Sequence, residues 1–160
     1  MRPEGTEDEV FLFGLFRSHA ERPLMRSGLD DLAIDQLVTF QYRSQTATNR
    51  ARFANAAFSI IESATAPIGR LIEHDEGETV YFVDFALLPE HQAKGLGTAF
   101  IELVADEWAS KGRAARVEVR YDNAHSLKLC RNLGFVLRGD NGTGFVNLVR
   151  PVDPAQRARP

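Results

Sequence analysis

Apolar residues in the first fifty positions recur with the spacing of two amphipathic helices. The first predicted helix covers residues 8–21, and Thr6-x-x-Glu9 before it has the form of a capping box. The second covers residues 30 to about 49 and has an aspartate, at either of its first two positions, as its cap. The apolar positions that define the two stripes are Val10, Phe11, Phe13, Leu15 and Phe16, and then Leu32, Leu37, Phe40 and Tyr42.

Between residues 58 and 88 the pattern changes to that of strands. Short apolar runs at 58–62 and 67–72 are separated by a turn of small residues, and the acidic run 75–78 marks the next turn. Residues 80–88, with the sequence VYFVDFALL, are almost continuously apolar, which is typical of a central strand buried on both faces. Pro89 ends that strand.

Strands and helices alternate after residue 90. A pair of glycines is followed by apolar residues at helical spacing as far as residue 110. Residues 115–120 alternate as a strand, and residues 123–134 have the composition of a helix that begins at an asparagine cap and ends at a glycine. Two further strands are predicted at 135–138 and 145–149.

The order of these elements predicts one α/β domain over residues 1–150. Helices come first, then a strand meander, and then strands that alternate with helices, which indicates a mixed central sheet with flanking helices. Residues 151–160 are rich in proline and arginine, and we expect them to form a disordered C-terminal tail.

Composition narrows the function classes. The chain of 160 residues has a net charge of −3, which does not favour nucleic-acid binding, and it lacks the roughly 18 consecutive apolar residues of a membrane span. The single cysteine, Cys130, cannot form an internal disulfide, so a reducing, cytoplasmic location is expected. The four histidines show no metal-ligand spacing, and we expect no bound metal.

Charge is distributed unevenly along the chain. Residues 1–90 contain 8 Lys and Arg against 15 Asp and Glu, a net charge of −7, whereas residues 91–160 contain 11 against 7, a net charge of +4. This division suits an anionic ligand bound by the second half and a cationic ligand beside the first. The alternative is that the charges are solvated on separate faces and bind nothing.

Residues 92–97, QAKGLG, join the apolar strand to the next helix. The first-turn amides of a helix lack helical partners and lie at the positive end of its dipole, so they can bind a phosphate that glycine allows to approach. A P-loop is excluded because Gly-Lys-Ser/Thr does not occur. A dinucleotide fold is disfavoured because Phe100 stands where its third glycine belongs, although Glu118 lies near the distance of a ribose-binding carboxylate. The remaining alternative is a tight turn without a ligand.

The same segment fits a third phosphate motif, Q/R-x-x-G-x-G/A, and here the chain resembles the GCN5-related N-acetyltransferase (GNAT) family. A second piece, NAHSLKLCRNLGF at residues 123–135, is similar to that family's N-x-x-A-x-x-L-Y-x-x-x-G-F. The resemblance covers residues 58–149 and implies the GNAT fold. That fold usually begins with a strand, and residues 1–6 are short for one, so we expect the first strand to be stunted or missing.

The resemblance also implies a cofactor site. Acetyl-CoA, a co-substrate, would lie where the strands at 80–88 and 115–120 separate, with its pyrophosphate on the amides of the glycine segment. Its pantetheine arm would pair with the backbone of the first of these strands and contact an asparagine. The cofactor-binding residues expected on this basis are Leu87, Leu88, Gln92, Lys94, Gly95, Leu96, Gly97, Thr98 and Asn123.

Acetyl transfer to an amine needs a group that takes a proton, because amines are largely protonated at neutral pH. Glu118 lies in EVRYDN, similar to the E-V-R-x-x-N of ribosomal-protein N-terminal acetyltransferases, which implies a base acting through water. Pairing of Glu118 with a neighbouring arginine is the alternative. Asp84, a carboxylate in an apolar strand, is a rival base or a structural acid. Cys130 occupies the slot of the family's tyrosine proton donor, and it is either a thiol donor or a small buried apolar residue.

We therefore expect an enzyme that transfers an acetyl group from acetyl-CoA directly to a primary amine. The acceptor is a small molecule or a peptide that the sequence does not identify, and the acidic N-terminal helices are expected on the acceptor side. A homodimer is an assembly that the sequence permits. The alternative function, which the missing tyrosine favours, is a non-catalytic module that binds or senses acyl-CoA.

Overall fold

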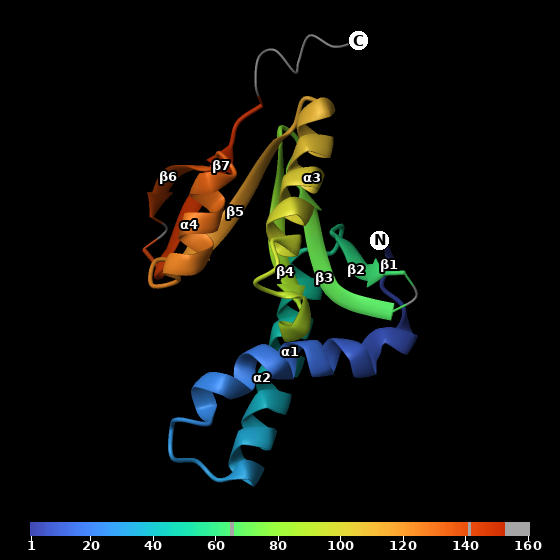
Figure 1. Cartoon of the computed structure of the whole chain (residues 1–160), viewed down its shortest axis with the longest axis vertical. Helices are drawn as coiled ribbons and strands as arrows, with labels where there is room; N and C mark the ends of the chain where they lie inside the picture. Colours follow the sequence, from blue (N-terminus) through green and yellow to red (C-terminus); the bar gives the residue numbers. More distant parts are fainter. Residues whose placement is uncertain (65, 141, 153–160) are drawn as a thin grey trace. The chain divides into compact units, whose positions relative to one another are not determined.

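Figure 1 shows the computed structural model of the chain, which describes residues 1–64, 66–140 and 142–152. Helices and strands lie close to the positions that the hydrophobic pattern predicts, and η denotes a short 3₁₀ helix. In chain order the elements are β1 (Arg2–Pro3), η1 (Thr6–Asp8), α1 (Glu9–Leu24), α2 (Asp31–Arg52), β2 (Ala57–Ser63), β3 (Ala66–Asp75), β4 (Thr79–Leu87), η2 (Pro89–His91), α3 (Leu96–Ser110), β5 (Ala114–Arg120), α4 (Ala124–Asn132), β6 (Val136–Asp140) and β7 (Phe145–Arg150).

Within the described residues the strands form a seven-stranded sheet with the order β1-β2-β3-β4-β5-β7-β6. β4 and β5 are parallel, whereas β7 is antiparallel to both of its neighbours, β5 and β6. The connection from β4 to β5 contains α3, because parallel neighbours need a long crossover. These findings confirm the predicted α/β fold, a mixed central sheet with flanking helices.

Contacts between residues divide the chain into two compact units. The first unit consists of residues 1–72 and 85–92, and the second consists of residues 73–84 and the chain from residue 93 onward. β3 and β4 each contribute to both units, and the single domain expected over residues 1–150 stays a prediction. Val152 is buried, and residues 153–160, the rest of the tail expected to be disordered, lie outside the described residues.

The core of the first unit forms where α1, α2 and β2 meet. Leu12, Tyr42 and Ile60 are buried together, and Phe13 and Phe16 pack on Tyr42 with ring centroids 5.3 and 5.6 Å apart. Removal of these apolar groups from water stabilises the helical pair on β2.

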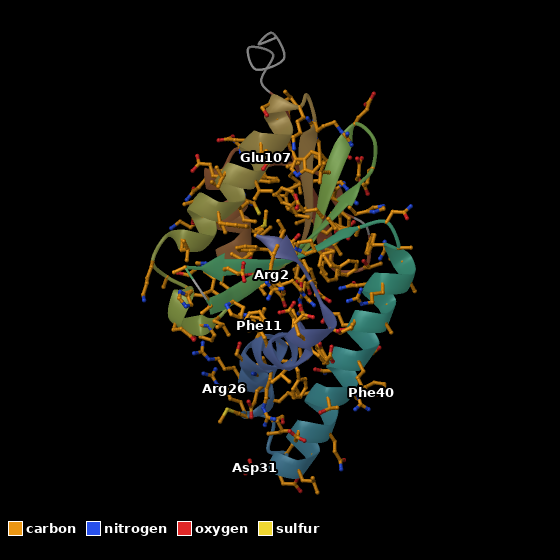
Figure 2. All side chains as sticks on the ribbon, turned by 90° about the vertical axis from the view of Figure 1, so that its right-hand side faces the viewer. Arg2, Phe11, Arg26, Asp31, Phe40 and Glu107 are labelled. Carbon is orange, nitrogen blue, oxygen red and sulfur yellow. The ribbon has the colours of Figure 1, made fainter. Side chains whose placement is uncertain are left out.

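The buried stripe of α2 differs from the predicted one. Ile34, Val38 and Tyr42 are buried at intervals of four residues, whereas Leu32 and Phe40 are 68% and 69% exposed. Figure 2 shows Phe40 on the outer side of the helix. Both stripes have helical spacing, so the spacing alone could not determine which face is buried.

The first strand is present but consists of two residues. Arg2 and Pro3 in β1 pair antiparallel with Ile60 and Ser59 in β2. This result agrees with the expectation of a stunted strand.

Helix capping follows the prediction in α2 but not in α1. The Asp30 carboxylate accepts a hydrogen bond from the Ala33 amide at 2.8 Å, which confirms an aspartate cap. The capping box predicted at Thr6 and Glu9 is wrong, because the Asp8 carboxylate instead accepts from the Gly5 amide at 2.8 Å. This bond caps η1, a 3₁₀ turn that precedes α1 and is closed by the bond from the Asp8 amide to the Gly5 carbonyl at 3.2 Å.

β3 and β4 approach each other closely at Gly69. A Cβ atom at this position would lie 2.4 Å from the carbonyl oxygen of Ala86 and 2.6 Å from a methyl group of Leu87. Glycine is therefore required here for space. Close to this point, the Leu88 amide, just after β4, donates to the Ile68 carbonyl at 2.9 Å and fixes the end of β4 beside β3.

β4 is buried along only part of its length. Val80, Tyr81, Phe82 and Leu87 are buried, whereas residues 83–86 are half-buried. Complete burial on both faces, predicted from the apolar run, is therefore wrong for residues 83–86.

Candidate active site

The ladder between the parallel strands β4 and β5 ends before either strand does. Their register runs from Thr79 opposite Ala114 to Phe82 opposite Val117. β4 continues to Leu87 and β5 continues to Arg120. The later residues of β4 thus have backbone groups that the ladder with β5 does not use.

The start of α3 has the backbone geometry of an anion-binding turn. Gly95, the N-cap residue, has φ +77° and ψ −8°, a left-handed conformation that glycine adopts without strain. The Ala99 amide makes a helical bond to the Gly95 carbonyl at 3.0 Å, so the amides of residues 96–98 precede the regular hydrogen bonding. A Cβ atom added at Gly95 would meet no protein atom within 4 Å. The glycine is thus needed for its conformation, and the space beside it is open.

Two side chains of the first unit bind the carbonyl oxygen of Leu87. Gln92 Nε2 donates to it at 2.7 Å, and His19 Nε2 lies 3.0 Å from it, as a donor in the tautomer that carries the proton on this nitrogen. The neighbouring Leu88 amide is bonded to β3. Pantetheine is expected to pair with backbone around Leu87 and Leu88, and these two backbone groups there already have partners in the protein. Sequence reasoning missed the role of His19, which no motif marks.

Asn123 is the N-cap residue of α4, as predicted. Its Oδ1 accepts a hydrogen bond from the Ser126 amide at 3.0 Å. The side chain is exposed, and its Nδ2 group is a hydrogen-bond donor that this bond does not use.

Cys130 lies on α4 and is buried, with 8% of its surface exposed. Burial raises the pKa of its thiol to about 11, because the thiolate is poorly solvated there. The thiol is therefore protonated at neutral pH and a weaker acid than an exposed thiol. These properties agree with a small buried apolar residue, one of the two alternatives for this position.

Glu118 on β5 is held by donors on both carboxylate oxygens. Arg116 Nη1 donates to Oε1 at 3.0 Å, and the hydroxyl group of Tyr81 donates to Oε2 at 3.3 Å. The pairing with a neighbouring arginine, considered as the alternative to catalysis, is thus present. It does not exclude proton transfer, because 23% of the Glu118 side chain stays exposed.

Arg116 extends this contact to a second carboxylate. Its Nε and Nη2 donate to the two oxygens of Glu76 at 2.9 and 2.6 Å, and its guanidinium carbon lies 3.8 Å from the centre of the Tyr81 ring. Burial opposes the charge on Arg116, but the two carboxylates together raise its pKa. The same contact lowers the pKa of Glu76. Sequence reasoning missed Glu76, since nothing links an acidic turn to a residue forty positions later.

Asp84, the rival base, lies on β4 and is half-buried. Tyr81 and Glu118 share one face of the sheet, as their hydrogen bond shows. Alternation along the strand directs Asp84, three residues after Tyr81, to the opposite face. The two candidate bases are therefore not brought together.

The second unit also has an open groove of about 790 Å³ where β4 and β5 begin. Residues 77–79 and 110–114 line it, and none of these is a predicted site residue. Lys111 and Arg113 in this groove form ion pairs with Glu107 and Asp75. Thr79 in this lining also donates a hydrogen bond to Glu76 at 3.0 Å.

The described part of the chain shows neither a membrane-spanning helix nor a metal-binding cluster. None of its helices combines the length and the apolar character that a membrane crossing needs. No cluster of three or more His, Cys, Asp or Glu side chains that could hold a metal ion occurs there either.

Comparisons with known proteins concern the family and the fold. The sequence matches a family model described as the acetyltransferase (GNAT) family over residues 29–135. A search of curated proteins gave no significant match.

Solved structures with a similar fold include three N-acetyltransferases. The PaiA N-acetyltransferase from Thermoplasma acidophilum, in complex with coenzyme A, has a TM-score of 0.69 and 16% identity, over 94% of this chain and 96% of that one. The ribosomal-protein-S18-alanine N-acetyltransferase from Escherichia coli has a TM-score of 0.66 and 17% identity, over 95% and 92%. A chimera of the Vibrio cholerae spermidine N-acetyltransferase SpeG and hSSAT has a TM-score of 0.64 and 19% identity, over 99% and 97%. At these identities the likeness concerns the fold.

Proposed function

The chain belongs to the GNAT acetyltransferase family, and we propose that it transfers the acetyl group of acetyl-CoA directly to a primary amine. The observation that carries this proposal is the start of α3, where Gly95 in a left-handed conformation precedes the amides of the first helical turn. Such a turn binds phosphate through its amides and its dipole. The coenzyme A in the structure of the similar PaiA enzyme supports the same ligand class.

In the second unit, the amides of Leu96, Gly97 and Thr98 are proposed to hold the pyrophosphate. Lys94, which is exposed just before Gly95, adds positive charge for the same groups. Asn123 is proposed to donate its Nδ2 to the pantetheine arm, because its Oδ1 is already bonded to the Ser126 amide.

In the first unit, the backbone at the end of β4 is proposed to pair with pantetheine, including Leu87 and Leu88. Gln92 binds the Leu87 carbonyl, so we assign it to shaping the loop before α3. His19 binds the same carbonyl and supports the same segment. Pantetheine would therefore have to share or displace existing contacts in order to pair with the backbone of Leu87 and Leu88.

Glu118 is proposed as the general base. The amine nitrogen forms a bond to the thioester carbonyl carbon, and the carbon–sulfur bond then breaks. The proton that nitrogen loses passes through a water molecule to the carboxylate of Glu118, and the released thiolate takes a proton from water. Arg116 and Tyr81 fix the carboxylate for this role through their bonds to its two oxygens.

A second candidate function, acyl-CoA sensing without turnover, is favoured by Cys130. This residue stands where the family has a tyrosine donor, and its buried thiol is a poor acid. Catalysis remains the better supported function, because Glu118 is held on both oxygens in the manner of a working base. A coenzyme A thiolate can also leave near neutral pH with water as its proton donor.

The acceptor is proposed to be a cationic amine on a small molecule or a peptide. The net charge of −7 in residues 1–90 favours approach of a cation. The similar structures include one enzyme named for an alanine of a ribosomal protein and one named for spermidine, so the fold does not choose between peptides and polyamines. A cytoplasmic location is proposed from the single, buried cysteine.

Release of free thiol from acetyl-CoA across a panel of amines tests the proposed function. The panel contains peptides with a free α-amine, lysine peptides with a blocked N-terminus, and polyamines. We expect turnover with at least one class. The absence of turnover with all of them, while acetyl-CoA is bound, would support the sensing function instead.

The base is tested by Glu118→Gln with the amine that the panel selects. Turnover is expected to fall by about 10²-fold or more, the usual effect of losing a general base, while coenzyme A binding persists. A higher pH should restore part of the rate, because more of the amine is then neutral. The matched control Glu102→Gln, at an exposed glutamate of α3, should keep the parental turnover. Full activity of Glu118→Gln would show that Glu118 is not the base and that Asp84 or bulk water takes the proton.

A further inference from the structure

Arg116 lies between two carboxylates in the second unit and is well shielded from water, with 16% of its side chain exposed. It gives two hydrogen bonds to Glu76, from Nε and Nη2, and a third to Glu118, from Nη1. Three of its five N–H groups, on all three nitrogens, are thus directed at acidic side chains. The group is a carboxylate–guanidinium–carboxylate bridge between the turn before β4 and the strand β5.

Tyr81 joins the same network from β4. Its ring supports the guanidinium group at 3.8 Å, a distance typical of stacking, and its hydroxyl group binds Glu118 Oε2. Tyr81 is itself buried and lies directly opposite Arg116 in the β4–β5 ladder. The position of Arg116 is thus fixed by the strand register as well as by its hydrogen bonds.

Glu118 has more hydrogen-bond donors than a simple ion pair would give it, one on each carboxylate oxygen. A bidentate pair between Arg116 and Glu76 would already satisfy the buried charge, and the hydroxyl group of Thr79 also binds Glu76 at 3.0 Å. Arg116 nevertheless uses its remaining nitrogen for Glu118, and Tyr81 takes the second oxygen. Glu118 is therefore held in one orientation while 23% of its side chain stays exposed. A fixed but accessible carboxylate is what a general base needs.

Few other charges face Glu118 within the described residues of the second unit. Arg120 follows on the same face of β5 but is exposed and paired with Asp122 at 2.6 Å. Across the ladder to β7, the residue opposite Glu118 is the uncharged Asn147. Arg116 is therefore the dominant cation at this carboxylate, and Glu76 is the carboxylate that competes for it.

We propose that Arg116 is a positioning residue that holds Glu118 in its reactive orientation, and that Glu76, by sharing Arg116, weakens the interaction between Arg116 and the Glu118 carboxylate. The catalytic part of this inference rests on the proposed role of Glu118 as base. The structural part, the control of Glu118 by Arg116 and Glu76, can be measured without any acceptor.

The two partners have opposite expected effects. Arg116→Gln leaves the carboxylates of Glu76 and Glu118 together without a cation, and like charges favour protonation, so Glu118 should titrate at a higher pH. Glu76→Gln removes the competing carboxylate and leaves Arg116 to Glu118 alone, so Glu118 should titrate at a lower pH. Arg116→Lys keeps the charge and should restore most of the parental titration while losing the forked geometry.

Carbon-13 NMR of glutamate side-chain carboxyl groups measures these titrations directly. The signal of Glu118 is assigned by its loss in Glu118→Gln. We expect the midpoint of its titration to rise by about one pH unit in Arg116→Gln and to fall in Glu76→Gln. The matched control is Arg113→Gln. It breaks the ion pair between Arg113 and Asp75, the residue before Glu76, and removes no hydrogen bond to Glu118. This control should leave the Glu118 midpoint unchanged.

A thermal melt identifies any variant that does not fold. If Arg116→Gln does not fold, Glu76→Gln decides the inference, because Glu76 is 30% exposed and tolerates a neutral replacement better than Arg116, which is 16% exposed. Midpoints that are equal in the parent, Arg116→Gln and Glu76→Gln would overturn the inference, as would a shift of the same size in Arg113→Gln.

Kinetics separates failure of this inference from failure of the proposed function. With the amine found by the panel, Arg116→Gln should lower kcat and move the acid limb of the pH profile upward. It should have no further effect when Glu118→Gln is already present, because the two residues act as one unit. If Glu118→Gln keeps full turnover while the NMR midpoints move as expected, Arg116 controls a carboxylate that is not the base. If Glu118→Gln is inactive and the midpoints do not move, Glu118 is the base and Arg116 does not position it.

Discussion

Cys130 shows at the residue scale how the surroundings of a side chain restrict its chemistry. Its burial raises the pKa of the thiol to about 11, so no thiolate forms below about pH 9 and the pH profile should contain no limb from this residue. Cys130→Ala should therefore keep turnover near the parental value and lose about 1 kcal/mol of unfolding free energy, through the smaller buried side chain. Thiol release and urea denaturation measure the two quantities. Loss of activity in a folded Cys130→Ala protein that still binds coenzyme A would show that the thiol is the proton donor.

Asp8 links the N-terminal strand to the helix that follows it, and it makes stability depend on pH. Hydrogen bonds from Arg2, and next from the Gly5 amide, lower the pKa of Asp8 to about 2. A carboxyl group whose pKa is lower in the folded chain stabilises the fold above its unfolded pKa, near 3.9, and this contribution is lost as the pH falls toward 2.

Urea midpoints measured between pH 5 and pH 2 test this account of Asp8. Asp8→Asn should flatten the fall in stability over this range, whereas Glu7→Gln, at an exposed neighbour, should keep the parental slope. The assignment would be contradicted if Asp8→Asn and the parent lost stability equally.

At the scale of elements, alanine substitution at two glycines is expected to change the free energy of unfolding in opposite directions. Gly69→Ala introduces a Cβ atom 2.4 Å from the Ala86 carbonyl oxygen, so it should lower the free energy of unfolding by about 1–3 kcal/mol. Gly14 lies inside α1 with no atom within 4 Å of an added Cβ, so Gly14→Ala should raise it by about 0.5–1 kcal/mol. Denaturant unfolding of both variants measures these changes. A neutral Gly69→Ala would show that β3 and β4 can separate at this point without cost.

The elements also show what sequence patterns could predict and why the rest escaped them. The start of α3 and the cap of α4 were predicted, because both depend on a few neighbouring residues, Gly95 and Asn123 above all. The buried face of α2 was not, since Leu32 and Phe40 fit helical spacing as well as the buried residues do. The capping carboxylate was wrongly assigned to Glu9, because residues 6–8 form a separate 3₁₀ turn that is capped by Asp8.

At the scale of the whole molecule, the fold and the family follow from two separated motifs, whereas the proposed catalytic network depends on long-range contacts. The glycine segment and the segment at 123–135 lie within the range that the family model matches. Glu76 and Arg116 are forty residues apart, and only the strand register brings them together. No local pattern could have revealed their contact. The choice of acceptor amine likewise depends on the surface of the folded protein, which no sequence motif describes.

The central claim is that the chain binds acetyl-CoA at the start of α3, and thermal unfolding with and without this ligand tests it most directly. At a hundredfold excess over Kd, a ligand that binds only the folded state adds about 2.7 kcal/mol, or about 5–10 °C in Tm for a chain of this size. Gly95→Asp should abolish the shift, because it places a negative charge against the phosphates. Gly112→Asp is the matched control at the other end of α3, with φ +74° and the same open space around an added Cβ atom. The shift produced by acetyl-CoA is compared within each variant, because the two variants differ in stability without it. The account predicts a shift in the parent and in Gly112→Asp but none in Gly95→Asp, and an unchanged Tm of the parent at millimolar acetyl-CoA would contradict it.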